Sequence, residues 1–578
     1  MKNTLLLGLS LLLSVPQLSA QTVKVTEKPL VLPTYEIGAP DVNPIFFTGR
    51  VYQGAQGHIY PYPLYDILTD EKIDKTYDAV YLDNEYVNVC VLPEIGGRIL
   101  SATDKTNNYE IFYRQTGIKP ALIGMLGAWL SGGVEWNIPH HHRPSSYMPI
   151  DWKIEENKDG SKTIWVGEME LRHRMKWSVG VTVYPNRSWV EARVKIINRT
   201  PFVQSILYWA NVSVHCNKDY EVIFPPATQF GTDHSKVYFT KWPMGEAVRG
   251  SGNDVELAWW KNYTGNSRSI FAWNFEDDFL AGYDHGKQAG TVHVANHHIV
   301  NGKKFFLWGN NPSAEMWNKM LSDKDGHYLE LMVGAYSDNQ PDYSWVGPGE
   351  TREFVQRWYG IRDIGSVKNA NDDAAVNLER RAPDKVFLGF NATTKYTDAK
   401  VLLKQGGNVL FEKVISIDPA TPFTATLPVP KTVKDADLYA VLLDKQGNEL
   451  VAYQPVELDN KELPSVVEGT KPVKEYQTVE ELYYAGLRVD QFHNARLNAM
   501  DFYNEALSRD SLDSRVNTVV GIRYAKAGQW DLAEKHLKRA LVRPAKDYTV
   551  VKDPEPHYYL GLIYQMQGRY KEAADQYW

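Results

Sequence analysis

Residues 189–196 read WVEARVKI, in which apolar and polar side chains alternate from Val190 to Ile196. This period of two is typical of a β-strand with one buried and one exposed face. Residues 87–91 (VNVCV) follow a similar pattern, and turn formers such as 157–160 (NKDG) separate such segments. Segments of this kind continue from about residue 31 to about residue 367. The sequence therefore predicts a large antiparallel β-sandwich in this region.

A second β region is predicted at about residues 384–458. Residues 399–403 (AKVLL) and 438–443 (LYAVLL) have the composition of strands. Hairpin turns are expected at 405–408 (QGGN) and 445–448 (KQGN). The length of this region suits a small immunoglobulin-like β-sandwich.

Beyond a polar linker at residues 461–474, the pattern becomes helical. Small residues and tyrosines recur there, because Gly521, Tyr524 and Gly528 reappear as Gly561, Tyr564 and Gly568. Such spacing allows paired helices to pack closely, as in tetratricopeptide repeats. The sequence stops at Trp578, inside the expected second helix of a repeat, so we expect the native chain to continue.

These patterns divide the chain into a mainly β part and an α part. We expect a signal peptide at 1–20, a large β-supersandwich at 21–375, a small β-sandwich at 376–460 and helical repeats at 475–578. A chain of 578 residues is too long for one compact core, which agrees with several domains. The formal charge of −7 gives no reason to expect a nucleic-acid partner.

The N-terminus has the features of a secretory signal peptide. Lys2 precedes an apolar run at residues 5–15 that is too short to cross a bilayer, and residues 18–20 (LSA) offer a cleavage site before Gln21. We therefore expect an exported protein, periplasmic or secreted, without a membrane span.

Two cysteines, Cys90 and Cys216, lie in strand-like contexts. They could form one disulfide in an oxidising compartment, but buried free thiols are favoured.

Residues 132–144, GGVEWNIPHHHRP, concentrate side chains capable of chemistry. Glu135 is a candidate catalytic carboxylate: Trp136 would desolvate it and raise its pKa, while an ion pair with Arg143 is the alternative. His140, His142, Arg143 and Trp136 are candidate ligands of sugar hydroxyls and rings. The histidine spacing differs from the helical pattern that grips one metal, so we expect neither a metal nor a cofactor.

Downstream residues supply possible partners for Glu135. Glu330 is the second candidate carboxylate, since glycoside hydrolysis needs two carboxyl groups and sugar epimerisation needs a base and an acid. Asp284 is a third, and it would hold His285 in one tautomer unless it simply forms a turn. The remaining candidate substrate-binding residues are His285, His297, Asp342 and the stacking residue Trp209.

Several strings of the sequence agree in order with a known group of proteins. They are GGVEWNIPHHHR (132–143), NRTP (198–201), YWAN (208–211), GYDHG (282–286) and GTVHVANHH (290–298). By these strings, the chain resembles an uncharacterised family of secreted bacterial proteins. The resemblance covers about residues 30–375, and implies a galactose-mutarotase-like β-supersandwich followed by tetratricopeptide repeats.

The resemblance also implies roles for particular residues. Glu330, followed by QPD at 340–342 and PGE at 348–350, is similar to the end of aldose mutarotases, where a Glu acts as base. The mutarotase acid is a histidine that would fall within 208–215, but here the histidine, His215, is displaced.

These observations predict a secreted carbohydrate-active enzyme, foremost a glycoside hydrolase acting on oligosaccharides through a carboxylate pair. An aldose epimerase-like enzyme is one alternative. A non-catalytic carbohydrate-binding scaffold, with a protein partner bound by the repeats, is the other.

Overall fold

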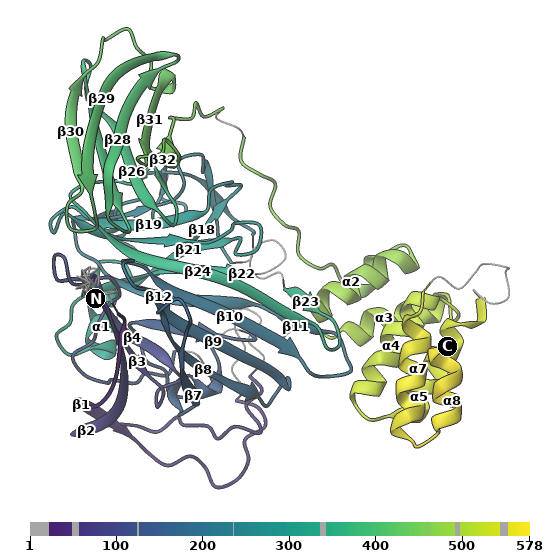
Figure 1. Cartoon of the computed structure of the whole chain (residues 1–578). Helices are drawn as coiled ribbons and strands as arrows, with labels where there is room; N and C mark the ends of the chain where they lie inside the picture. Colours follow the sequence, from purple (N-terminus) through teal and green to yellow (C-terminus); the bar gives the residue numbers. More distant parts are fainter. Residues whose placement is uncertain are drawn as a thin grey trace, which may run out of the picture.

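A computed structural model describes residues 22–48, 57–123, 126–140, 142–234, 236–335, 343–459, 462–491, 497–543 and 553–578. It contains a large two-sheet sandwich, a small sandwich and a lobe of paired helices, which Figure 1 shows in succession along the chain. The predicted mainly β fold with C-terminal helical repeats is confirmed.

The larger sheet of the main sandwich has twelve antiparallel strands within the described residues, in the order β1-β2-β3-β4-β6-β12-β22-β21-β18-β14-β15, with β5 paired to β4. These strands are β1 (Lys24–Ile37), β2 (Leu68–Asp83), β3 (Val87–Leu92), β4 (Arg98–Asp104), β5 (Tyr109–Glu110), β6 (Val134–Asn137), β12 (Tyr208–His215), β14 (Phe230–Thr232), β15 (Phe239–Lys241), β18 (Arg268–Trp273), β21 (Gly302–Leu307) and β22 (Tyr328–Ala335).

The second sheet has eight strands in the described chain, in the order β13-β19-β20-β24-β10-β9-β8-β7. They are β7 (Asp151–Glu156), β8 (Lys162–Glu170), β9 (Met175–Val183), β10 (Val190–Asn198), β13 (Tyr220–Ile223), β19 (Phe279–Asp284), β20 (Ala289–Val294) and β24 (Thr351–Arg362). Two two-stranded sheets pair β11 (Gln204–Ile206) with β23 (Ser344–Val346) and β16 (Met244–Glu246) with β17 (Asp254–Glu256).

The two sheets enclose the main core. Trp136 on the 12-stranded sheet and Trp177 on the 8-stranded sheet are both completely buried in it. Burying an apolar side chain stabilises the fold by about 1.5–3 kcal/mol. Because successive side chains of a strand point to opposite faces, the alternate residues of β6, β12 and β22 face away from this core. We call this side of the larger sheet its outer face.

Part of the outer face is covered by helix α1 (Pro312–Leu321) and the segments 113–123 and 126–130. Tyr113, Trp129 and Leu321 form a small apolar cluster there with Tyr328 of β22. Gln115 ties the first of these segments to α1, since its side-chain amide donates to the carbonyl of Leu321 at 3.0 Å.

The small sandwich packs two four-stranded sheets, β25-β26-β27-β30 and β29-β28-β31-β32. Its strands are β25 (Asn369–Ala370), β26 (Ala374–Ala382), β27 (Lys385–Ala392), β28 (Tyr396–Gln405), β29 (Asn408–Ile417), β30 (Phe423–Pro428), β31 (Leu438–Leu443) and β32 (Glu449–Tyr453). It begins before residue 376, the boundary expected from the sequence, because β25 pairs with β26.

The small sandwich docks against the 8-stranded sheet, away from the outer face of the larger one. Arg357 of β24 binds both Glu191 of β10 and Asp372 at the start of the small sandwich. Trp189 donates its indole N–H to the carbonyl of Asp372 at 3.1 Å.

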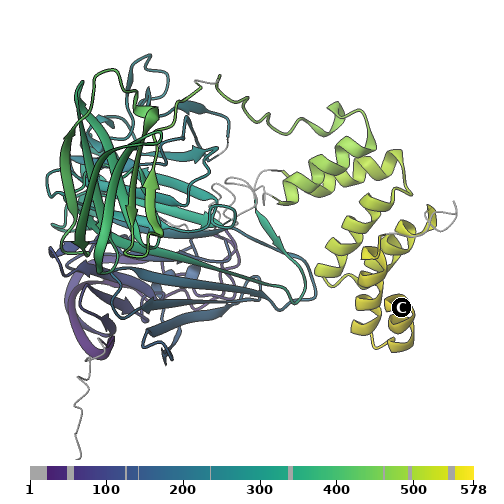
Figure 2. The same cartoon turned by 45° about the horizontal axis from the view of Figure 1, so that its top comes forward.

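The helical lobe stands beside the main sandwich at the end of a long irregular segment (Figure 2). Its helices are α2 (Val479–Gln491), α3 (Ala499–Arg509), α4 (Ser514–Lys526), α5 (Trp530–Ala540), α7 (Glu555–Met566) and α8 (Tyr570–Tyr577). They pair as α2–α3, α4–α5 and α7–α8. Gly521 and Gly561 lie where a side chain would collide with Leu537 and Tyr577 of the paired helix, which explains why these small residues recur.

Two further sequence predictions concern single features. Cys90 and Cys216 are both buried free thiols, as favoured. Within the described residues, no helix is long and apolar enough to cross a membrane. The expected signal peptide lies outside those residues.

Gly133 fixes the entry into β6 and cannot be replaced without strain. Its φ is +60°, and a Cβ there would lie 2.0 Å from the carbonyl oxygen of Ile99 on β4. A left-handed backbone alone costs a residue with a side chain about 1 kcal/mol, and the collision adds to this cost.

We predict that Gly133→Ala lowers the free energy of unfolding by about 3 kcal/mol, because β4 must move to admit the methyl group. Urea unfolding followed by tryptophan fluorescence would measure it. Gly349→Ala is the matched control: its φ is +72° but its Cβ position is open, so only about 1 kcal/mol should be lost. Equal losses in the two variants would contradict the collision.

Candidate active site

Glu135 and Glu330, which are 195 positions apart in the sequence, lie on the same outer face. β12 separates their strands: Glu135 of β6 pairs with Asn211, and Glu330 of β22 pairs with Ser213. Neighbouring strands are about 4.8 Å apart and the two partners on β12 are two residues apart, so the backbones of the two glutamates lie roughly 12 Å from each other. The predicted convergence of these two carboxylates is thus found in the structure.

The environment of Glu135 is rich in hydrogen-bond donors. Its carboxylate accepts from the Trp129 indole at 2.9 Å and contacts Nδ1 of His142 at 3.0 Å, with the Asn211 amide at 3.5 Å. Burial by itself raises the pKa of Glu135, but the charge and hydrogen bond of His142, with Arg98 and Trp129, lower it to about 2. Glu135 is therefore ionised at every physiological pH.

This finding corrects the sequence prediction that Trp136 raises the pKa of Glu135. Trp136 points to the opposite side of β6, into the core between the sheets, and donates its indole N–H to the carbonyl of Gly97. Its ring cannot stack on a ligand at the outer face. The tryptophan that does touch Glu135 is Trp129, from the covering segment.

His142 is held by Glu135 through Nδ1. Burial by itself lowers the pKa of His142, but the charge and hydrogen bond of Glu135 raise it above the ordinary value of 6.5. The charge of Glu330 raises this pKa further, so the imidazole is electrostatically coupled to both carboxylates. A protonated imidazole held through Nδ1 would exchange a proton with a ligand through Nε2.

Glu330 is the second carboxylate of the site, and its pKa is shifted in the opposite direction from that of Glu135. Burial raises the pKa of Glu330 to about 7, against the opposing charges of His142 and Lys304. Lys304 of β21 lies on the same outer face, and burial lowers its pKa to about 7 while Glu330 opposes the shift. Its ammonium group is 3.1 Å from Nε2 of His234. We call Glu135, His142, Lys304 and Glu330 the acid–base cluster.

Lys304 was not expected in the site. The string Gly302-Lys303-Lys304 begins the buried strand β21. The signal that could have placed it is the apolar run FFL at residues 305–307, which continues the strand and forces one lysine onto each side of the sheet.

Two other candidates from the same stretch, Arg143 and His140, are buried and not available to a ligand. Arg143 is 2 % exposed. Its guanidinium group donates to Ser145, Glu168 and two main-chain carbonyls, and it stacks on the ring of Trp177. It thus pairs with Glu168, not with Glu135. His140 is buried against Ser205, with Nε2 2.6 Å from its carbonyl oxygen and 3.1 Å from its hydroxyl.

Trp209 lies on the outer face but is covered. Its ring packs against Phe271, with the ammonium group of Lys304 at 4.8 Å from its centre. Gly334 makes this possible, because a Cβ there would be 2.7 Å from the indole. Trp209 is 2 % exposed and supports Lys304 rather than offering a platform to a sugar.

Asp284, His285 and His297 belong to the other sheet and do not join the cluster. Asp284 is a buried turn residue that accepts from Asn217 at 2.7 Å and from two main-chain N–H groups. His285 is held not by Asp284 but by Glu221 at 2.7 Å. His297 pairs with Asp278 at 2.8 Å. The last candidate, Asp342, lies outside the described residues.

A metal site was not expected from the histidine spacing. In the parts of the chain that the structure describes, no three His, Cys, Asp or Glu side chains are grouped so as to hold a metal ion.

A β-supersandwich with an acid–base cluster on one sheet, joined to helical repeats, defines the class of this protein. Residues 55–358, more than half of the chain, match the family described as a domain of unknown function, DUF5107. The chain belongs to this family. Residues 369–453 match the second domain of YphG-like proteins and coincide with strands β25 to β32.

Solved structures resemble the whole chain or its sandwich. A TPR-domain-containing protein from Parabacteroides distasonis has a TM-score of 0.52 at 16 % identity, over 96 % of this chain and 80 % of its own. Galactose mutarotase-like proteins from Clostridium acetobutylicum and Lactobacillus casei match half of the chain, with TM-scores of 0.36 and 0.31 and identities of 10 % and 11 %. They cover 50 % and 49 % of this chain and 96 % and 99 % of their own.

The Glu135–His142 pair should make stability depend on pH in a defined window. The low pKa of Glu135 contributes stability above its ordinary value of 4.5, which is lost as the pH falls toward about 2. The raised pKa of His142 contributes stability below 6.5, which is lost as the pH rises through that raised pKa. The pair is therefore most stabilising between about pH 4.5 and 6.5.

We predict that Glu135→Gln lowers the free energy of unfolding by about 3 kcal/mol within this window, because it leaves a buried imidazolium without its counter-ion. An NMR titration should show the pKa of His142 falling below that of the wild type. Glu221→Gln, in the more exposed pair with His285, is the control and should cost less than about 1 kcal/mol. An unchanged pKa of His142 would disprove the assignment.

Proposed function

We propose that this protein is an exported carbohydrate-active enzyme of the aldose-epimerase type, in which the acid–base cluster transfers protons at the anomeric centre of a sugar. The observation that carries this proposal is that His142, which Glu135 orients through Nδ1, lies on the sheet face that also carries the buried carboxylate of Glu330. Opening a sugar ring requires one base and one acid placed in this way.

In the proposed reaction, Glu330 accepts the proton of the anomeric hydroxyl group while Nε2 of His142 donates a proton to the ring oxygen. The bond between the anomeric carbon and the ring oxygen breaks, and the open-chain aldehyde forms. Rotation about the next carbon–carbon bond and reversal of both proton transfers close the ring with the opposite configuration. Glu135 acts as a positioning residue, because it holds His142 by Nδ1 and favours its charged form.

Lys304 has a defined part in this reaction. Its positive charge lowers the pKa of Glu330 against the effect of burial, so that the carboxylate can ionise near neutral pH. A general base is most effective when its pKa lies near the working pH.

Glycoside hydrolysis is the second candidate, and one observation favours it. The two carboxylates have opposite protonation preferences, with pKa values of about 2 for Glu135 and about 7 for Glu330. A glycosidase uses such a pair, one protonated as general acid and one ionised. Against it, Glu135 already accepts hydrogen bonds from Trp129 and His142, which makes it a poor nucleophile.

We predict that Glu330→Gln lowers kcat for mutarotation by about 10²–10⁴-fold, as expected for loss of a general base. His142→Gln should have a loss of similar size. The measurement is the approach to anomeric equilibrium of a panel of reducing sugars, followed by polarimetry or NMR. The matched control is Glu221→Gln, which disrupts the Glu–His pair of the other sheet and should leave kcat unchanged.

The pH dependence separates the two candidate reactions. If Glu330 is the base, activity rises as the pH increases through about 7 and falls again at higher pH, when His142 loses its proton. If Glu330 is instead the general acid of a glycosidase, activity is full below about pH 7 and falls above it. Activity on panels of reducing sugars and of oligosaccharides, measured from pH 4 to pH 9, would distinguish them. Turnover in neither panel would contradict a catalytic role.

We also propose that the protein is exported and that its helical repeats bind a protein partner. The signal-like N-terminus supports export, which fractionation of cells that express the full chain would test. A scaffold that binds a sugar without turnover is indicated if the wild type binds a sugar of either panel but converts none.

A further inference from the structure

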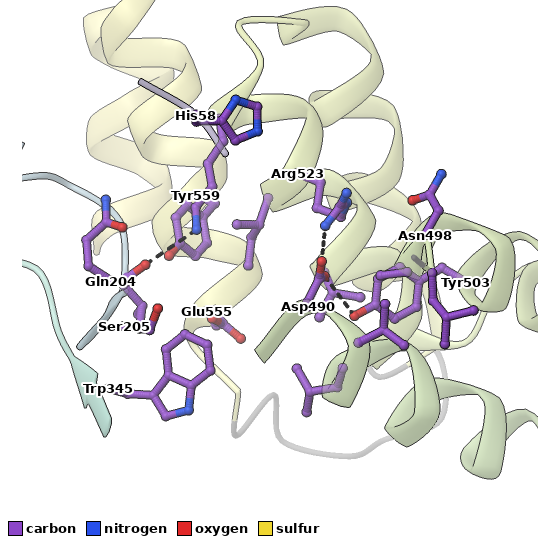
Figure 3. A pocket seen from close by; sticks show the side chains of 18 of the residues that line it. His58, Gln204, Ser205, Trp345, Asp490, Asn498, Tyr503, Arg523, Glu555 and Tyr559 are labelled. Carbon is purple, nitrogen blue, oxygen red and sulfur yellow. Dashed lines mark hydrogen bonds and ion pairs between the residues drawn. The ribbon is translucent and has the colours of Figure 1, made fainter. Parts of the chain in front are cut away.

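A cavity of about 560 Å³ lies between the main sandwich and the helical lobe. Its size is within the range of about 300–1,000 Å³ that is usual for ligand sites, which often lie between domains. Figure 3 shows Gln204, Ser205 and Trp345 on the side of the sandwich and Asp490, Tyr503 and Arg523 on the side of the helices. We call this cavity the interdomain cleft.

The cleft is built by specific contacts that hold the two lobes together. The loop at residues 198–203 carries them: the carbonyl of Pro201 accepts from the Tyr558 hydroxyl at 2.8 Å, and Phe202 stacks on Tyr559 with ring centres 5.9 Å apart. Lys526 donates to the carbonyl of Val203 at 3.4 Å. The helical lobe therefore packs directly against the sandwich.

Asn198 gives this loop its shape. Its side-chain amide donates to the carbonyls of Phe202 and Val346, and its oxygen accepts from the N–H of Thr200 at 2.9 Å. The string NRTP at residues 198–201, which the acid–base cluster does not use, thus places Phe202 against the helices.

One buried contact, made by Ser205, links the wall of the cleft to the stretch of chain that carries His142. Ser205 lines the cleft and also binds the imidazole of His140, two positions before His142. In the two-stranded sheet of β11 and β23, Ser205 pairs with Trp345, whose indole is 38 % exposed and lies in the cleft. An exposed indole is a flat apolar surface with one hydrogen-bond donor, which suits a sugar ring.

The charges of the cleft balance one another. Arg523 is paired with Asp490, which also accepts from the Tyr503 hydroxyl at 3.1 Å, as Figure 3 shows. Lys526 and Glu555 supply one further charge of each sign. The four charges cancel, so the cleft offers hydrogen bonds without a net attraction for an acidic or basic ligand.

We propose that the interdomain cleft binds the distal units of a neutral oligosaccharide whose reducing-end unit lies at the acid–base cluster. Trp345 is the stacking platform, and the polar side chains of α2, α4 and α7 bind hydroxyl groups. The helical repeats thereby contribute directly to the choice of substrate. The identity of the ligand rests on the proposed function, but the cleft and its binding role can be tested without turnover.

The test is calorimetric binding to the full chain, with monosaccharides and the corresponding linear tetrasaccharides of gluco, galacto, manno and xylo configuration as probes. We expect at least one tetrasaccharide to bind tenfold or more tightly than its monosaccharide. Trp345→Ala should remove this advantage, and Trp345→Phe should keep part of it. Trp152→Ala is the matched control, because Trp152 is 37 % exposed but lies on β7 of the other sheet.

The outcomes for the cleft and for catalysis are distinct. Binding that depends on length and on Trp345, and that persists in Glu330→Gln, supports the cleft whether or not the wild type turns over any sugar. The cleft proposal is overturned if all tetrasaccharides bind like their monosaccharides, or if folded Trp345→Ala binds like the wild type. Binding of peptides in place of sugars would also overturn it and would assign the cleft to a protein partner.

Discussion

The positions of Glu135, Lys304 and Glu330 in the acid–base cluster depend on the two-residue period of adjacent strands. The inner side chains of β6, β12 and β22 belong to the core between the sheets, as Trp136, Val212 and Leu331 do. Glu135 and Glu330 must consequently face outward. A slip of one residue in β22 would bury the carboxylate of Glu330 in that core and expose Leu331, so the apolar core itself fixes the site.

The two glutamates illustrate how neighbours decide the state of a buried carboxylate. Glu135 is surrounded by donors and by the charge of His142, and the attraction exceeds the penalty of burial. Glu330 has fewer such partners, and burial dominates in spite of Lys304. One sheet face therefore holds an anion that orients an imidazolium beside a carboxyl group that can gain or lose a proton near neutral pH. This difference arises from contacts between strands and covering segments.

Most of the fold was readable from local pattern, and part of the site was not. Residues 189–196 and 87–91 have the strand period, and the recurring glycines have the repeat period, because both signals are local. Both carboxylates were predicted as a pair. The direction of the pKa of Glu135 was predicted wrongly, since adjacency in sequence suggested Trp136 when the contact comes from Trp129. Neighbours in a strand point to opposite faces, so Trp136 could not have been that contact.

Long-range partners account for the other differences. The pairing of His285 with Glu221 and the burial of Lys304 depend on strands that are distant in sequence, which spacing alone does not reveal. The cleft was also invisible from the sequence, because its two walls come from different domains. Composition could only suggest that aromatic platforms exist somewhere in the chain.

The packing of the helical lobe against the loop at residues 198–203 limits how the two parts can change over evolutionary time. The loop is short, and Asn198 binds it internally at both ends. An insertion there would move Phe202 away from Tyr559 and widen the interdomain cleft beside Trp345. Lineages that keep the repeats should therefore tolerate few length changes at this point.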